Sequence, residues 1–356
     1  MIGNNIYQDI KNLFYLNRSL TGRGTLDTLK YFKKKIKNLK IVSVSSNSKV
    51  YDWKVPLQWE IKNAWISNNK NQKIIDFKKN NLHVVGYSHK VNKIISKKDL
   101  LKKIFTIKNN PKAIPYVTSY YKKDWGFCVA YNQMKLFNSN SYKVFIDSQL
   151  KKGKLNYGEI FLRGQSKKEI LLSANICHPS MVSNELSGPT ILLSISKWLM
   201  KKKRKFSYRI IFIPETIGSI VFLKKNFKKI NKNIIGGYTL TCLGDNGPFT
   251  FIESKDHSIT NFLTKKVLKK YKKRKIYNFL SRGSDERQYC SPQINFPIGS
   301  LCRSKHSQFK EYHTSLDNLT ITNGKILQES FNYIKKCLLS FENQEIYQTL
   351  IKCEPF

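Results

Sequence analysis

The feature that most constrains the fold of this chain is the alternation of strand-like and helix-like segments after residue 158. Buried-strand patterns occur at residues 169–176, 208–213, 237–243 and 298–302, and amphipathic helical patterns follow them. Such alternation is typical of proteins in which helices cover both faces of a mostly parallel sheet. We therefore predict an α/β fold built on a mixed, mostly parallel sheet flanked by helices.

The first 150 residues have a different pattern. Residues 1–45 carry apolar side chains at helical spacing, interrupted by a polar segment after which Thr25 is the predicted N-cap. From about residue 50 to residue 150 short β-like runs rich in aromatic side chains take over, among them residues 116–121. One helical stretch, residues 97–104, interrupts them.

This change of pattern also predicts the domain organisation. We expect residues 1–48 and 151–356 to form one α/β domain, and residues 49–150 to form an inserted β-rich domain that covers one side of the cleft. A chain of 356 residues is long enough to bury more than one domain's core. The prediction would be wrong if the segment simply continued the main sheet.

The net charge is strongly positive, since 64 Lys and Arg residues face 23 Asp and Glu residues and give +41. Such a charge is typical of proteins that bind nucleic acid or an anionic glycan. However, the excess is nearly all Lys in scattered short runs, and abundant Asn and Ile accompany it, as AT-rich codons would also produce. We therefore do not expect nucleic-acid binding, and steep salt dependence of DNA binding would be the evidence for it.

Cysteine usage and the lack of leader-like or membrane-spanning segments predict a cytoplasmic protein. Seven cysteines without close pairs argue against a secreted disulfide framework. The N-terminus lacks a basic and apolar leader, and no apolar run approaches the length of a membrane span. Whether the protein forms a homo-oligomer stays open at this point.

Residues able to perform chemistry follow the predicted strands one after another. His178 follows the first strand, Glu215 the second and Asp245 the third, and His313 lies beyond the fourth. Because sites in open α/β sheets form at the carboxyl ends of the strands, we expect these side chains to meet. Two imidazoles together with carboxylates suit zinc. Glu215 follows an apolar strand, and we predict that it is the catalytic base beside a metal-bound water.

Each of these residues also has an ordinary structural explanation. A histidine after a strand can be a hydrogen-bonded loop residue. Asp245 precedes Asn-Gly and can form a turn, and Glu215 can complement a helix dipole. Cys177 is predicted to be a small buried residue, because nothing near it in sequence would lower its pKa. What favours a metal or hydrolytic site is the recurrence of such residues at four successive strand ends.

The order of these residues resembles that of the co-catalytic zinc aminopeptidases. The motifs that carry this resemblance are His178, Asn184–Gly188, Glu215, Asp245, Gly283–Asp285 and Tyr312–His313. More closely, the chain resembles bacterial aminopeptidase-like proteins encoded among surface-polysaccharide biosynthesis genes. That resemblance covers about residues 10–340 and is carried by the segments Leu16–Gly22, Tyr51–Pro56, Asn81–Tyr87, Ile114–Tyr121 and Glu311–Ser315.

The resemblance implies a zinc site. His178 and Asp245 would ligate one metal position and His313 the other. Glu215 stands where the superfamily often has two adjacent acids, one a base and one a ligand, but here Pro214 and Thr216 flank it.

A second departure from the superfamily concerns the bridging ligand. Asn184 stands where the superfamily has an Asp shared by two zinc ions. An amide offers one neutral carbonyl oxygen, so it compensates the repulsion between two dications less well. We therefore expect one tightly bound zinc ion, held by His178 and Asp245 or shared with His313, with Asn184 as a further candidate ligand, and no tightly bound second ion. The neighbouring Glu185 is the alternative source of the missing charge.

The resemblance implies hydrolysis of an amide bond. The leading hypothesis is a zinc-dependent, aminopeptidase-like hydrolase of a peptide or an N-acylated amino-sugar precursor, linked to surface polysaccharide biosynthesis. Asp285, Arg287 and Tyr312 are the predicted substrate-binding residues. The alternative is a non-catalytic peptidase-like binding protein with a degenerate metal site, as the transferrin receptor is in the same superfamily. Relatives often continue into a C-terminal winged-helix-like extension, which we do not expect in this chain.

Overall fold

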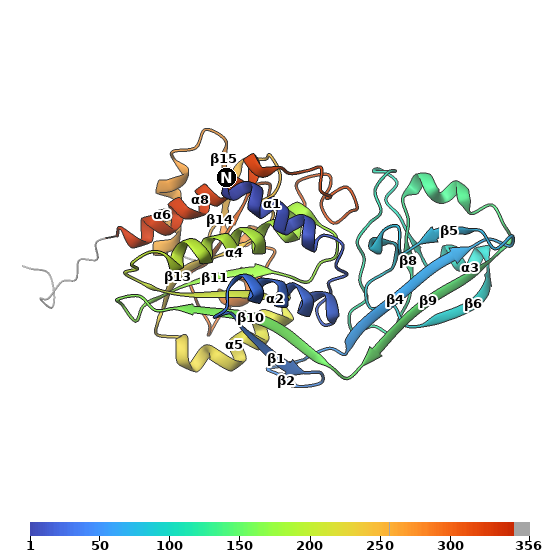
Figure 1. Cartoon of the computed structure of the whole chain (residues 1–356), viewed down its shortest axis with the longest axis horizontal. Helices are drawn as coiled ribbons and strands as arrows, with labels where there is room; N and C mark the ends of the chain where they lie inside the picture. Colours follow the sequence, from blue (N-terminus) through green and yellow to red (C-terminus); the bar gives the residue numbers. More distant parts are fainter. Residues whose placement is uncertain (256, 345–356) are drawn as a thin grey trace, which may run out of the picture.

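The computed structural model of the chain describes residues 1–255 and 257–344. Its centre is an eight-stranded mixed sheet with the strand order β1-β10-β12-β11-β13-β16-β14-β15 (Figure 1). The strands are β1 (Lys40–Ser45), β10 (Lys154–Leu162), β11 (Glu169–Asn175), β12 (Ser207–Ile213), β13 (Ile234–Leu240), β14 (Phe249–Ile252), β15 (Arg274–Tyr277) and β16 (Ile298–Cys302).

The four middle strands β12, β11, β13 and β16 are parallel, whereas β1 and β10 pair antiparallel at one side of the sheet. Every residue of β11 is buried, because both faces of this central strand pack against a hydrophobic core. Ile170, Leu172 and Ala174 enter one hydrophobic core and Leu171 enters the other. The predicted fold class, a mixed and mostly parallel sheet between helices, is confirmed.

Helices cover both faces of this sheet. Helices α1, α2, α4, α6 and α8 contribute side chains to one core, and α5 and α7 contribute to the core on the opposite face. The helices are α1 (Ile2–Leu13), α2 (Arg23–Lys35), α4 (Ser187–Met200), α5 (Ile217–Ile230), α6 (Ile259–Leu268), α7 (Glu286–Tyr289) and α8 (Gly324–Glu342). In the part of the chain that the structure describes, no helix is both long and apolar enough to cross a bilayer.

The aromatic-rich segment forms a second, antiparallel sheet with the order β5-β4-β9-β6, hydrogen-bonded separately from the main sheet. It lies beside the α/β body (Figure 1). Its strands are β4 (Gln58–Ser67), β5 (Lys73–Asp76), β6 (Val91–Ser96) and β9 (Ser141–Lys151), with α3 (Lys97–Leu101) and the short pairs β2 (Lys49–Val50), β3 (Trp53–Lys54), β7 (Ile104–Phe105) and β8 (Phe127–Cys128). The segment thus does not extend the main sheet, and the exact domain boundaries stay a prediction.

Two predictions for the N-terminal region are wrong. The helical pattern assigned up to residue 45 ends earlier, because Lys40–Ser45 forms β1 and pairs with β10. Thr25 is not the N-cap of α2 but lies inside it, where its hydroxyl donates to the carbonyl of Ser19. The N-cap is Gly22, whose φ of 130° and close approach to the Trp59 carbonyl exclude a side chain.

Further along the chain, one predicted strand does not form and two predicted elements end at other residues. Residues 116–121 do not form a strand; their backbone instead turns toward the main domain, where Tyr116 N donates to the His313 carbonyl over 2.8 Å. Helix α3 ends at Leu101, three residues before the predicted end. Strand β13 ends at Leu240, which lengthens the loop that carries Asp245.

Candidate metal and catalytic site

Three of the predicted site residues meet at the carboxyl edge of the main sheet. His178 follows β11, Glu215 follows β12, and His313 lies in the loop beyond β16. The two imidazole ring centroids are 5.2 Å apart, inside the limit of about 8 Å that a shared zinc site sets. His178 Nε2 lies 3.9 Å from Glu215 Oε2. Burial, and then the charge of His178, lowers the pKa of His313 to about 3, so this imidazole is neutral and can donate a lone pair.

Glu185 fixes the orientation of His178. Its Oε2 lies 2.8 Å from His178 Nδ1, and its Oε1 accepts the His178 backbone N–H over 2.9 Å. Burial lowers the pKa of His178, but the Glu185 carboxylate outweighs this and raises the pKa well above its ordinary value. With Nδ1 held, Nε2 is the nitrogen that faces Glu215. A carboxylate behind a histidine is the arrangement that orients metal-ligating imidazoles in proteins.

This geometry predicts the effect of replacing Glu185 with glutamine. The amide keeps a hydrogen-bonding group near His178 but removes the charge that makes the imidazole a better ligand. We expect the affinity for zinc to fall by about 10- to 100-fold, measured by competition with a chromogenic chelator. The matched control is Glu253→Gln, because Glu253 forms an ion pair with Lys265 and lies on a different loop. Unchanged affinity in Glu185→Gln would contradict the orienting role.

Cys177, His178 and Glu185 are the one set of three His, Cys, Asp or Glu side chains in the described ranges whose ligand atoms all lie within 4.8 Å of one another. The contacts argue against a metal between them, because the nitrogen nearest Glu185 is already hydrogen-bonded to it. Cys177 is 2% exposed, as predicted, and burial raises the pKa of its thiol to about 11. Its Sγ accepts the Glu215 backbone N–H over 3.2 Å. We interpret Cys177 and Glu185 as side chains that support His178 and Glu215 from behind.

Glu215 is half-buried, and the Ser284 hydroxyl donates to its Oε1 over 2.9 Å. Burial raises the pKa of Glu215, as a general base requires. Asp285 supports the same loop, since its Oδ1 accepts from the Thr216 backbone N–H over 2.7 Å and from the Ser219 hydroxyl over 3.1 Å. Because Asp285 is only 1% exposed, its position fits a residue that positions Glu215 better than one that contacts substrate.

The side chains of Asp245 and Asn184, the two other predicted metal ligands, are already in contact with neighbouring protein groups. The Asp245 carboxylate accepts from the Ser183 hydroxyl over 2.8 Å, the Ser304 hydroxyl over 2.7 Å and Gly247 N over 2.7 Å. The last bond is an Asx-type turn, the structural alternative that the sequence left open. The amide of Asn184 lies between two sulfur atoms, with Nδ2 3.6 Å from Met181 Sδ and Oδ1 3.8 Å from Cys242 Sγ. Both side chains therefore have partners of their own.

An aromatic wall surrounds the imidazoles. Tyr312 stacks on His313 with centroids 4.0 Å apart and an interplanar angle of 9°. Tyr116, from the inserted segment, contacts both histidine rings, with centroids 5.1 Å from His178 and 5.3 Å from His313. Sequence analysis assigned no role to Tyr116, although it lies in one of the segments that carry the family resemblance. Arg287 is exposed, and its Nη2 lies 3.4 Å from the Thr216 hydroxyl.

Asp317 is a further residue that sequence analysis did not single out. Its carboxylate accepts the backbone N–H groups of Val182, Ser183 and Asn184 over 3.2, 2.7 and 2.9 Å. These residues begin the π-helical turn Val182–Leu186, so Asp317 holds the turn that carries Glu185 and Asn184. Burial raises the pKa of Asp317 to about 7, although the three donors act in the opposite direction.

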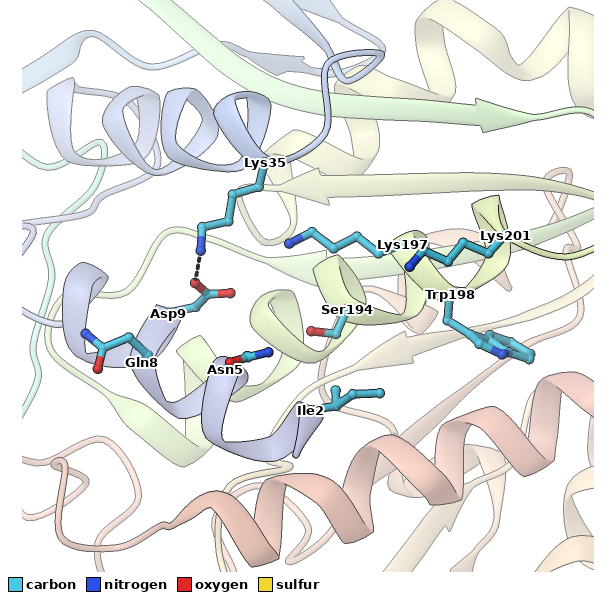
Figure 2. Close-up of a pocket in the computed structure, with 9 residues that line it drawn as sticks. All are labelled: Ile2, Asn5, Gln8, Asp9, Lys35, Ser194, Lys197, Trp198 and Lys201. Carbon is cyan, nitrogen blue, oxygen red and sulfur yellow. Dashed lines mark hydrogen bonds and ion pairs between the residues drawn. The ribbon is translucent and has the colours of Figure 1, made fainter.

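A sizeable pocket on the helical face also lies away from these residues. It has a volume of about 440 Å³ and lies between α1, α2 and α4 (Figure 2). Its lining residues are Ile2, Asn5, Gln8, Asp9, Lys35, Ser194, Lys197, Trp198 and Lys201. Asp9 is already paired with Lys35 over 2.5 Å, and the pocket contains no predicted site residue. We therefore place the chemistry at His178 and not in this pocket.

The fold, together with the histidines and carboxylates at its strand ends, defines an aminopeptidase-like protein. The chain belongs to the family described as a domain of unknown function, DUF4910, which matches residues 7–344. It is 43% identical over 356 residues to a Clostridium acetobutylicum protein named as a polysaccharide biosynthesis protein with aminopeptidase-like domain. That match covers 99% of this chain and 81% of the relative.

Solved structures agree with this assignment. A crystal structure described as a peptidase from Clostridium acetobutylicum superposes with a TM-score of 0.94 at 43% identity, covering 99% of this chain and 84% of that one. A zinc aminopeptidase from Bacillus subtilis shares the fold, with a TM-score of 0.67, 9% identity and coverage of 97% and 96%. A peptidase M28 precursor from Shewanella amazonensis does so with a TM-score of 0.69, 11% identity and coverage of 99% and 96%. The predicted resemblance to this superfamily is confirmed.

Proposed function

We propose that this protein is a zinc-dependent hydrolase of an amide bond in a peptide or an N-acylated amino-sugar precursor. The observation that carries the proposal is the meeting of His178, His313 and Glu215, with Nε2 of His178 left facing Glu215 by the bond from Nδ1 to Glu185. Two imidazoles beside a carboxylate are the donor set that suits zinc. The name of the Clostridium acetobutylicum relative supports a link to polysaccharide biosynthesis.

The residues have separate tasks in this proposal. His178 and His313 would hold one zinc ion, which when bound would lower the pKa of a water ligand and polarise the amide carbonyl. Glu215 Oε2 takes the proton from the attacking water and passes it to the leaving amine. Tyr116 and Tyr312 enclose the imidazoles and limit access of bulk water. Asp245 stays a candidate further ligand, since its Oδ2 accepts only the Ser183 hydroxyl, and a single ion is favoured because Asn184 lacks the charge of a bridging carboxylate.

The proposal also concerns where the protein acts and on what. The six cysteines within the described ranges are all buried and form no disulfide, which fits the reducing cytoplasm. Arg287 is the exposed cation beside Glu215 and is the residue that we propose contacts an incoming substrate. We also propose that the protein can form a homo-oligomer, and we assign no interface to it.

The test is turnover by the purified full-length chain after incubation with zinc. A panel of aminoacyl anilides and N-acetylated amino sugars would be assayed for release of the free amine, with and without a chelator. The proposal expects zinc-dependent release from at least one class, and the responding class identifies the substrate. No release from any member of the panel by protein that holds zinc would contradict it.

Two observations favour a second candidate, a peptidase-like binding protein without catalysis. Asn184 replaces a carboxylate at the bridging position, and Asp245 already has three strong hydrogen-bond donors. Both features are expected in a metal site that has lost catalytic function. Binding of an N-acetylated amino sugar without turnover, by protein that contains no zinc, would support this alternative over the hydrolase.

A further inference from the structure

Arg18 is a buried cation with an unused hydrogen-bond donor. Its side chain is 1% exposed and contacts the backbone of His178. Nε donates to the His178 carbonyl over 2.9 Å and Nη1 to the Leu13 carbonyl over 2.6 Å, whereas Nη2 has no partner. Both acceptors are neutral. Buried polar groups are nearly always paired, so an unpaired guanidinium nitrogen requires an explanation, such as a bound water or ion.

Glu185, the carboxylate with the largest electrostatic effect on Arg18, does not form an ion pair with it. Glu185 acts on Arg18 only through space, since both of its oxygens bond to His178. An arginine guanidinium stays protonated in proteins, even where it is buried. The charge is therefore present, buried and without an anion in contact.

Arg18 lines a small inner hollow between the inserted segment and the main domain. Its lining comes from both parts of the chain and includes Asn17, Arg18, Asn81, Tyr116 and Pro179. A second unpartnered polar atom, Oδ1 of Asn81, belongs to the same set. About 10 Å³ is open to the centre of a water-sized sphere, which is the room that one water needs. The hollow thus holds one small particle and excludes a sugar ring.

We propose that this inner hollow binds one small anion, either a halide ion or a single carboxylate oxygen, against Nη2 of Arg18. A water would satisfy the hydrogen bond but would leave the buried guanidinium without an anion in contact, whereas a bound anion supplies both. The amide of Asn81 meets the anion with Nδ2 after a 180° rotation, which exchanges two groups of nearly equal size. Binding would not depend on whether the site hydrolyses amides.

A larger groove lies next to this hollow, because the two share lining residues. This groove of about 430 Å³ shares Asn17 and Asn81 with the inner hollow and also contains Lys78 and Lys79. These lysines raise the local concentration of anions. Because Tyr116 lines the inner hollow and also contacts both site histidines, an anion there would stiffen the wall of the metal site.

The direct test is crystallography of the full chain with two salts. Crystals grown in sodium bromide are expected to show an anomalous peak beside Nη2 of Arg18. Halide-free crystals grown in sodium acetate are expected to show a carboxylate oxygen at the same place if carboxylates can enter, and a water there if only halides can. Water beside Nη2 in both crystals would overturn the proposal, as would bromide seen only as an adventitious ion at other sites.

A variant test in solution separates this site from the general effect of salt on a basic protein. Asn81→Asp places a carboxylate in the hollow, so it should supply the anion itself and weaken bromide binding at least about tenfold. In the unmutated chain Tm should rise with bromide at constant ionic strength, because a bound anion stabilises the folded state, and this rise should disappear in Asn81→Asp. The matched control is Asn80→Asp, because Asn80 Oδ1 accepts from Leu82 N and a carboxylate can do the same. Equal bromide dependence in both variants would overturn the proposal.

Discussion

Replacing Glu215 with glutamine is expected to lower the turnover of the amide substrate by about 10²- to 10⁴-fold while leaving the zinc content of the protein unchanged. Glutamine has nearly the same shape and can still accept the bond from Ser284 to Oε1, but it cannot take a proton from water. The loss should appear in kcat, because the reacting proton and not substrate binding is affected. Steady-state kinetics and elemental analysis of the same preparations measure both quantities.

Two outcomes would contradict this assignment of Glu215. Unchanged turnover would show that another group is the base. Loss of zinc together with activity would identify Glu215 as a ligand instead. The matched control is Glu60→Gln on β4, where Glu60 accepts a hydrogen bond from Gln58 over 2.6 Å in the inserted sheet, and this variant should keep both zinc and turnover.

Replacing His178 with asparagine is expected to lower the affinity for zinc by at least about 100-fold. The amide nitrogen of asparagine takes the place of Nδ1 and can keep the bond to Glu185, but no atom replaces Nε2. Alanine is the less informative change, because it would also leave Glu185, which is 2% exposed, as an unpaired buried charge. Breaking a buried pair in that way costs about 3–5 kcal/mol of folding stability. Calorimetric titration with zinc measures the affinity.

His83→Asn is the matched control for this variant. His83 is also buried, and its Nδ1 lies 2.8 Å from the carbonyl oxygen of Cys128 in the inserted segment. The same change of side chain there should leave zinc binding intact. If His178→Asn bound zinc as tightly as the unmutated protein, the metal would lie elsewhere and the site would have to be reassigned.

The position of the site at the sheet edge could be predicted from the sequence. Largely apolar strands such as Ile170–Ala174 indicate burial on both faces, and polar residues that follow neighbouring parallel strands lie at one edge of the sheet. This reasoning brought His178, Glu215 and His313 together across long stretches of sequence. The resemblance to the aminopeptidase superfamily rests partly on the order of these same residues and added their expected roles as metal ligands and base.

The finer roles could not be predicted, because they depend on which atom of a side chain faces which partner. Glu185 was weighed as a metal ligand, but the geometry places it on Nδ1 of His178. Asp245 had a turn as its alternative, and its bond to Gly247 N favours that turn. Arg18 and Tyr116 contact the site from segments far away in sequence. No local pattern around them indicates that contact.

The central claim is that this chain holds one zinc ion at His178 and His313. The most direct test is the zinc content of the unmutated, full-length protein after dialysis against micromolar zinc, measured per chain by elemental analysis. The account predicts close to one ion per chain, rising toward two in Asn184→Asp, where a carboxylate could bridge a second ion. Two ions in the unmutated protein, or none, would contradict it.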